Sequence, residues 1–463
     1  MNIFRESDYQ SPLIRKKRRD IKIYNKLGEI KMIKTIKNNH LYWDGCDTVE
    51  LAKEYGTPLY VVSETAIVKE CQALQQDFIQ KYENVRVAYA SKAFNTLAMI
   101  KIIEREGLCL DVVSGGELYT AIQANYPAEK IEFNGNNKSL EELEMALEYG
   151  VGRIIVDSLQ ELHWLIALCK QKQTVAKVMF RITPEVEVAT HDFISTGQKD
   201  SKFGIPLEEH ILFALIQQAI EAPEIDFYGL HFHIGSQLDT NETHLLAAET
   251  ALKLVLTIKE KFAYDIRELN YGGGFGVRYV EEDIRQPYRY FLDPLMALTE
   301  NFCQTHQLRR PTIVIEPGRS LIAEAGITLH RIGSIKEVPG IRKYVAIDGG
   351  MTDNIRPGLY QANYTGVLAN KASEKATEIV TIAGKACEST DILVKDLALP
   401  KVETDDLFAT FSTGAYGYAM ASNYNKLLIP AVVLVKDGQA DVIVKRQSYQ
   451  QLLQNEMLPN HLH

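Results

Sequence analysis

The segment Val85-Arg86-Val87-Ala88-Tyr89-Ala90-Ser91-Lys92 is an apolar, β-branched run that ends in a polar break, and the amphipathic stretch Thr96–Arg105 follows it. This order predicts one strand, one loop and one helix. The pattern recurs through residues 85–318, and repeated strand–helix alternation is typical of a parallel sheet. The predicted strands are Val85–Ala90, Cys109–Val113, Ile131–Phe133, Arg153–Val156, Lys177–Ile182, Gly229–Ile234, Glu268–Tyr271 and Thr312–Ile315.

Eight such units over about 235 residues predict a (β/α)8 TIM-type barrel, whose usual size is about 250 residues. Polar residues stand at the ends of the predicted strands, among them Lys92, His233 and Glu316. Because the active site of such a barrel lies at the carboxyl ends of its strands, this placement favours the barrel. A doubly wound open sheet is the structural alternative.

A β-domain is predicted after residue 325, where short β-like runs alternate with glycine and proline. The segment Leu41–Val62 also has the pattern of strands, and we expect it to join that domain. The predicted fold class is therefore α/β, a TIM-type barrel plus a C-terminal β-domain (β-barrel or sandwich) that includes the N-terminal strands. The predicted divisions are a basic, disordered extension (1–37), N-terminal strands (38–63), the barrel (64–323) and the C-terminal β-domain (324–463).

The composition is that of a folded globular enzyme, with 463 residues, of which 46% are hydrophobic and 24% are charged. This length excludes a single small binding module. No run approaches the roughly 18 apolar residues of a spanning helix, and the N-terminus lacks the apolar core of a secretory signal. The six cysteines form no C-x-x-C pair, which indicates neither a zinc site nor a disulfide framework. We expect a cytoplasmic protein with no membrane partner and no metal.

The charge is uneven along the chain. Residues 1–37 hold 11 Lys/Arg against 4 Asp/Glu, a net charge of +7. Because the whole chain has a net charge of −9, the remaining residues carry −16. An acidic body argues against a nucleic-acid partner, because phosphate contacts depend on Lys and Arg. The basic cluster Arg15–Arg19 is expected to be a solvated extension, with a nucleic-acid or membrane-surface tail as the alternative. Met32 precedes the first domain-like segment and is a candidate start of translation.

Two motifs at the predicted strand ends point to a reactive amine and an anion site. Lys92 ends an apolar strand, where desolvation would favour a neutral, nucleophilic amine; a solvated surface lysine is the alternative. The glycine run within Asn270–Gly276 follows the seventh strand, and consecutive glycines let backbone N–H groups approach an anion. Loops after the seventh and eighth strands often bind phosphate in these barrels, which favours a phosphate site over a simple turn.

Two further motifs each leave two interpretations open. His231 and His233, at i and i+2, would face one side of a strand and could ligate zinc; alternatively His233 lies flat on a cofactor ring while Ser236 contacts phosphate. Glu316-Pro317-Gly318-Arg319 is either a surface ion pair at a turn or a carboxylate for a protonated pyridine nitrogen beside a guanidinium for an anion.

Three segments of the β-domain are hard to explain as core or turn. They are Ala386–Ser389, Gly414–Tyr418 and Asp348–Tyr360. Cys387 alone would be a small buried hydrophobe more often than a catalyst. Taken with Lys92 and the barrel motifs, in this order, the set resembles the fold-type III pyridoxal-phosphate-dependent decarboxylases, the family of the ornithine, arginine and diaminopimelate decarboxylases. The resemblance covers residues 40–440.

The resemblance implies pyridoxal 5'-phosphate as cofactor and a homodimer with shared active sites. Lys92 would bind the cofactor aldehyde as a Schiff base, and Cys387, from the partner subunit, would protonate the α-carbon. The other implied cofactor-binding residues are His233, Ser236, Gly273, Gly274, Gly276, Glu316, Gly318, Arg319 and Tyr416. The implied substrate-binding residues are Arg319, Arg356, Tyr360, Tyr416 and, again from the partner, Glu388.

Arg356 guides the expected choice of substrate, because a further cation would neutralise the extra carboxylate of meso-2,6-diaminopimelate. The expected reaction is its decarboxylation to L-lysine and CO2, the last step of lysine biosynthesis. The alternatives are decarboxylation of ornithine, arginine or carboxynorspermidine, an inactive regulatory homologue, and a zinc-dependent barrel hydrolase.

Overall fold

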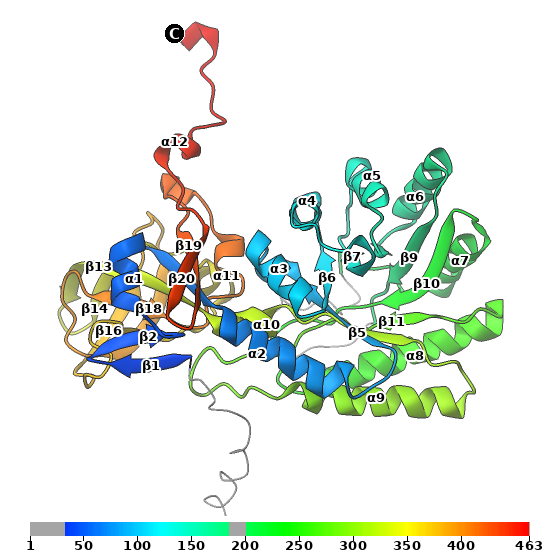
Figure 1. The fold of residues 1–463 in the computed structure, drawn as a ribbon, viewed down its shortest axis with the longest axis horizontal. Helices are drawn as coiled ribbons and strands as arrows, with labels where there is room; N and C mark the ends of the chain where they lie inside the picture. The colour runs from blue at the N-terminus through cyan, green and yellow to red at the C-terminus, as the bar shows by residue number, and fades with distance from the viewer. Residues whose placement is uncertain (1–32, 185–200, 463) are drawn as a thin grey trace, which may run out of the picture.

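The computed structural model describes residues 33–184 and 201–462. One part of the molecule is a closed barrel of eight parallel strands, and a β-domain lies beside it (Figure 1). Neighbouring barrel strands follow one another in sequence, and the last pairs with the first. The barrel strands are β5 (Val85–Ala90), β6 (Cys109–Val112), β7 (Ile131–Phe133), β8 (Arg153–Val156), β9 (Ala176–Arg181), β10 (Ile225–His231), β11 (Glu268–Asn270) and β12 (Thr312–Ile315).

Several of the helices that pack around the barrel begin at residues whose side chains cap them, near the carboxyl ends of the strands. Ser114, Ser139 and Ser158 each accept a hydrogen bond from the backbone N–H of a glutamate three residues later. Such caps satisfy N–H groups that the helix leaves unpaired and fix where each helix starts. The helices are α2 (Glu64–Leu74), α3 (Leu97–Arg105), α4 (Gly115–Gln123), α5 (Leu140–Tyr149), α6 (Leu159–Lys172), α7 (Glu209–Glu221), α8 (Glu242–Phe262), α9 (Tyr288–Thr305) and α10 (Arg319–Ile322).

The barrel prediction is confirmed, and the open-sheet alternative is wrong. The largest boundary difference is in β10, which starts at Ile225 instead of Gly229 and ends at His231. Gly229 lies inside this strand at a β-bulge, and a Cβ there would come within 1.9 Å of the Glu268 carbonyl oxygen. The close approach of two strands requires this glycine, so it does not mark a boundary.

The second part of the predicted fold class, a β-domain joined by an N-terminal strand, is also confirmed. Strand β4 (Leu59–Ser63) lies between β13 (Gly326–Val338) and β19 (Ala431–Lys436). The remaining strands of this nine-stranded sheet are β14 (Arg342–Ile347), β15 (Gly366–Leu368), β16 (Glu378–Ala383), β17 (Ile392–Leu399), β18 (Leu407–Thr410) and β20 (Gln439–Val444). Two short helices, α11 (Arg356–Tyr360) and α12 (Tyr449–Leu452), accompany it.

Two details of the N-terminal prediction are wrong. Lys34–Lys37, assigned to the extension, forms β1 and pairs with β2 (His40–Trp43), which pairs with β3 (Cys46–Asp47); residues 1–32 lie outside the described residues. The segment Leu41–Val62 also contains a helix, α1 (Thr48–Tyr55), whose first turn is capped by Asp47. The spacing of its apolar residues is also compatible with a strand, but the Asp47 cap favours the start of a helix.

Hydrophobic burial joins the parts of the fold. One core cluster fills the spaces between the barrel and its helices and continues into the β-domain. A second cluster packs the three-stranded N-terminal sheet against β4, β13, β18 and β19, and the Trp43 indole N–H donates to the Ala325 carbonyl oxygen at 3.0 Å. In the part of the chain that the structure describes, no helix has the length and apolar character needed to cross a membrane.

Candidate active site

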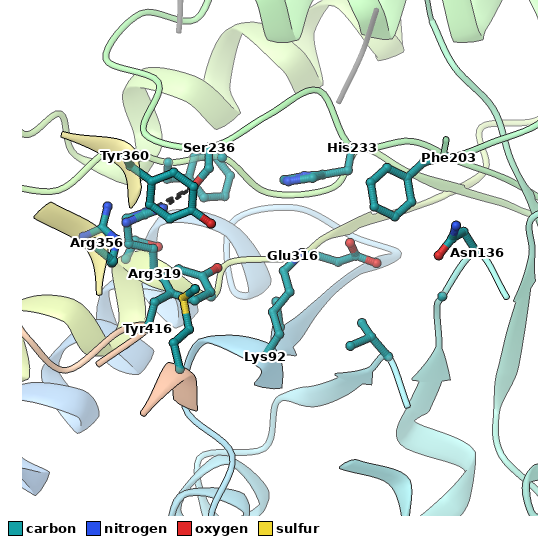
Figure 2. Close-up of a pocket in the computed structure, with 18 of the residues that line it drawn as sticks. Lys92, Asn136, Phe203, His233, Ser236, Glu316, Arg319, Arg356, Tyr360 and Tyr416 are labelled. Carbon is teal, nitrogen blue, oxygen red and sulfur yellow. Dashed lines mark hydrogen bonds between the residues drawn. The ribbon is translucent and has the colours of Figure 1, made fainter. Parts of the chain in front are cut away.

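A cavity of about 360 Å3 lies at the carboxyl ends of the barrel strands. Most of its wall comes from barrel loops, and the β-domain closes one end with Arg356, Tyr360, Tyr416 and Met420. Figure 2 shows Arg356, Tyr360 and Tyr416 gathered with Arg319 at one end, while Asn136 and Phe203 stand at the other. The cavity therefore lies where the two parts of the fold meet.

Lys92 reaches into this cavity from a short helical turn, Ser91–Ala93, directly after β5. Its neighbours Ser91 and Ala93 are buried, whereas Lys92 is exposed to the cavity. The Ser91 hydroxyl donates to a Glu117 carboxylate oxygen at 3.1 Å, which ties the turn to α4. The buried side chains of Ser91 and Ala93 anchor the turn, and the Lys92 side chain points into the cavity (Figure 2).

Glu316 follows β12 and is buried in the cavity wall. His231 Nε2 lies 3.0 Å from Glu316 Oε2, and the Asn270 amide donates to Oε1 at 2.8 Å. Burial alone would raise the pKa of Glu316, but His231, Lys92 and Asn270 together hold that pKa below its ordinary value. The site thus contains a buried carboxylate that stays ionised.

His233 lies beyond the end of β10, in the loop that faces Lys92 across the cavity (Figure 2). Burial lowers the pKa of His233 well below its ordinary value, and the nearby Lys92 and Arg181 cations lower it further. The Gly273 N–H donates to His233 Nδ1 at 3.3 Å, so Nδ1 is an acceptor. A neutral imidazole held in this way presents a flat face to whatever the cavity binds.

The glycine run after β11 packs closely against neighbouring backbone. A Cβ at Gly273 would lie 2.1 Å from the Glu316 carbonyl oxygen, and one at Gly276 would lie 2.7 Å from the Leu238 carbonyl oxygen. Gly274, at φ +108°, lines the cavity. Of the three glycines expected to hold phosphate, only Gly274 is on the cavity wall; the other two allow the turn to pack.

Two buried guanidinium groups stand at the β-domain end. Arg319 donates to the Ser236 hydroxyl at 2.9 and 3.1 Å and to the Tyr279 hydroxyl at 2.6 Å, while Arg356 donates to the Tyr364 hydroxyl. Among the described residues, neither has a carboxylate partner, although they are 6% and 5% exposed. Buried cations are normally paired with anions, so this end of the cavity is built for anionic ligand groups.

The family model for the pyridoxal-dependent decarboxylase, pyridoxal binding domain, matches residues 64–323. The chain belongs to the pyridoxal-dependent decarboxylase family. It is 48% identical over 414 residues to the diaminopimelate decarboxylase of Bacillus methanolicus, covering 89% of this chain and 96% of that one. It is 47% identical over 421 residues to that of Bacillus subtilis (91% and 96%). The crystal structure of M. jannaschii diaminopimelate decarboxylase in co-complex with L-lysine matches with a TM-score of 0.87 at 37% identity, covering 93% of this chain and 99% of that one.

As a pyridoxal-dependent decarboxylase, this protein uses pyridoxal phosphate, and the cavity fits that cofactor. It offers an amine for the aldehyde at Lys92, an ionised carboxylate for the ring nitrogen at Glu316 and a flat neutral ring at His233. Arg319, lacking a carboxylate partner in the described chain, and the Ser236 hydroxyl offer donors for a phosphate. Because the chain belongs to the pyridoxal-dependent decarboxylase family, the zinc-hydrolase alternative is wrong. Within the described residues, no three His, Cys, Asp or Glu side chains are placed to hold a metal ion.

The structure of this decarboxylase brings most of the predicted site residues together but leaves some apart. Lys92, His233, Ser236, Gly274, Glu316, Gly318, Arg319, Arg356, Tyr360 and Tyr416 all line the cavity. Cys387 and Glu388 are exposed and are not part of this cavity wall in the described chain. In the loop that carries them, the Cys387 N–H donates to the Asn425 side chain at 2.6 Å.

Several wall residues were not predicted as site residues. Asn136, Arg181 and Phe203 line the end of the cavity remote from Arg356. Arg181 ends β9, and its Nε lies 3.9 Å from Asp157 Oδ2. Its position at a strand end was a signal that could have identified it, whereas Asn136 and Phe203 lie in loops whose path the sequence pattern does not give.

Proposed function

We propose that this chain converts meso-2,6-diaminopimelate to L-lysine and CO2 as a cytoplasmic homodimer. The observation that carries the substrate assignment is the buried Arg356 guanidinium, which stands beside Arg319 at one end of the cavity and has no carboxylate partner in the described chain. A substrate with a second carboxylate supplies the anion that this end lacks, and ornithine does not. The names of the relatives, and the L-lysine in the M. jannaschii co-complex, support the same choice.

The chain's residues would prepare the cavity as follows. Lys92 would hold the cofactor aldehyde, and His233 would support one face of the ring. Gly274 and Ser236 would hold the phosphate together with Arg319, and the Glu316 carboxylate would keep a proton on the ring nitrogen. Pyridoxal phosphate, when bound, draws electrons away from the substrate α-carbon and so stabilises the carbanion that departing CO2 leaves.

Substrate selection falls to the β-domain end. The Arg356 guanidinium would pair with the distal carboxylate, while Tyr360 and Tyr416 would contact the substrate from the same end. Tyr279 and Tyr364 hold the two guanidinium groups in place, and their rings meet edge to face at 5.1 Å. Because Arg319 and Arg356 are already oriented by these hydroxyls, little ordering remains to be done when substrate binds.

The homodimer is proposed because two of the expected reactive groups are not in their own chain's cavity wall. Cys387 is the exposed one of the six cysteines, and residues 387–390 are all exposed. We infer that Cys387 of the partner subunit supplies the proton that replaces the departing carboxylate on the α-carbon. Glu388 of the partner subunit would accept hydrogen bonds from the distal amine.

The test is identification of the products. Purified protein loaded with pyridoxal phosphate is incubated with meso-diaminopimelate, and CO2 and L-lysine are measured. Release of the two in equal amounts supports the proposal. Absence of CO2 release from meso-diaminopimelate would contradict the assigned substrate, and release of CO2 without lysine would contradict the assigned product.

A further inference from the structure

Beneath the cavity, the interior of the barrel holds a connected set of charged and amide side chains. Arg86 donates to Glu132 Oε1 at 3.1 Å and to Glu268 Oε2 at 2.7 Å, and Arg153 Nε donates to Glu268 Oε2 at 2.8 Å. These residues come from β5, β7, β8 and β11, and Glu132, Arg153 and Glu268 are buried. Opposite charges paired inside the barrel form a polar floor.

Asn270 is the link between this floor and the cavity. Its amide nitrogen donates one hydrogen bond to Glu132 Oε2 at 2.9 Å and another to Glu316 Oε1 at 2.8 Å. Its side-chain oxygen accepts from the Gly272 N–H at 2.9 Å. The reverse orientation would set the amide oxygen against two carboxylates, so these partners permit one orientation only.

Glu132 fixes Asn270 from below. Glu132 is 1% exposed and lies in the middle of β7, with one oxygen on Arg86 and the other on Asn270. Burial raises the pKa of Glu132 to about 7, against the opposing effect of Arg86. Whether or not this carboxyl carries a proton, an oxygen remains available to accept from Asn270.

We propose that Asn270, anchored by Glu132, is a positioning residue that holds the Glu316 carboxylate toward the cofactor ring nitrogen. The proposal rests on the role of Glu316 proposed above. Through its contact with Gly272, Asn270 also ties that carboxylate to the glycine turn beside the expected phosphate site. One buried amide thus fixes the position of the carboxylate for the ring nitrogen relative to the expected phosphate site.

The test compares Asn270→Ala, Glu132→Ala, Glu132→Gln and the double variant Asn270→Ala/Glu132→Ala with the wild type. Two readouts besides activity are the absorption spectrum of the bound cofactor across pH and the dissociation constant of pyridoxal phosphate. Tyr271→Phe is the matched control, because Tyr271 is the next residue, is buried and loses one hydrogen bond, to Thr299, outside this set. Asn270→Ser, which keeps one donor, replaces Asn270→Ala if that variant does not fold.

We expect Asn270→Ala to shift the cofactor spectrum, raise the dissociation constant about tenfold or more, and lower kcat with little change in KM. Glu132→Ala should do the same more weakly, Glu132→Gln should recover part of the loss, and the double variant should be no worse than Asn270→Ala. An unchanged spectrum in Asn270→Ala, or additive losses in the double variant, would overturn the proposal. Glu316→Gln distinguishes failure of this proposal from failure of the proposed role of Glu316. If Glu316→Gln leaves the spectrum unchanged, the proposed role of Glu316 itself is wrong.

Discussion

The backbone N–H of Tyr416 donates a hydrogen bond of 2.9 Å to the carbonyl oxygen of Ala93. This contact joins the β-domain to the barrel turn that carries Lys92. Tyr416 adopts a left-handed backbone conformation, φ 58°, which costs a residue with a side chain about 1 kcal/mol. The cavity is therefore a joint product of both parts of the fold, and variants on either side are expected to change its chemistry.

Lys92→Ala is expected to lower turnover by at least about 1,000-fold, because it removes the amine that holds the cofactor. The protein should stay folded, since the lost side chain projects into the cavity. CO2 release, the visible absorption of the bound cofactor and the thermal unfolding midpoint measure the three effects. Lys101→Ala, on the exposed surface of α3, is the control, and normal turnover by Lys92→Ala would remove Lys92 from the mechanism.

Cys387→Ala is expected to slow the reaction about 100-fold or more, as loss of a proton donor does. If the thiol acts on the other subunit's site, a mixture of Lys92→Ala and Cys387→Ala subunits, allowed to exchange, should regain about a quarter of wild-type activity, because half the dimers then hold one intact site. Mixing is followed by CO2 release and by sedimentation. No recovery in a mixture shown to exchange would place both groups in one chain's site.

Arg356→Met should lower the preference for meso-diaminopimelate over ornithine about 30- to 100-fold, since it removes a charged partner of the distal carboxylate. Tyr364→Phe should act in the same direction and less strongly, because it frees the guanidinium without removing it. The ratio of kcat/KM for the two substrates is the measurement, with the partly exposed Arg331→Met as the matched control. An equal loss of kcat/KM on both substrates would show that Arg356 does not bind the distal carboxylate.

The lowered pKa of His244 predicts how the free energy of unfolding depends on pH. Burial lowers its pKa to about 4, and its Nε2 lies 3.0 Å from the Gly273 carbonyl oxygen. As pH falls from about 6.5 to 4, the unfolded chain takes up this proton before the folded chain does, so the free energy of unfolding falls by up to about 3 kcal/mol. His244→Gln should lose less stability over this range in urea unfolding, and an equal loss would contradict the assignment.

The alternation of apolar and amphipathic segments was enough to predict the barrel, because a parallel strand buried on both faces leaves a run such as Val85–Ala90. It could not reveal that the strand begins at Ile225, before Gly229, because the need for glycine there comes from the close approach of the Glu268 backbone on the next strand. The helix within Leu41–Val62 was missed, although Asp47 before it is a capping residue.

The strand-end rule likewise located Lys92, His233 and Glu316. It could not indicate Glu132, which lies mid-strand and resembles a solvated residue until the sheet closes and places it inside the barrel. The partners of Arg319 and Arg356 were equally hidden, because Tyr279 and Tyr364 meet only when two distant segments pack together. Such long-range contacts depend on the whole fold, and local pattern does not contain them.

The most direct test of the assigned reaction uses the wild-type protein loaded with pyridoxal phosphate. Its kcat/KM values are compared for meso-diaminopimelate, ornithine, arginine and carboxynorspermidine. With Arg319 on the cofactor phosphate, the site should prefer the substrate with the second carboxylate by about 100-fold or more, because the other substrates leave the buried Arg356 guanidinium unpaired. A clear preference for ornithine or another of these substrates would contradict the assigned reaction.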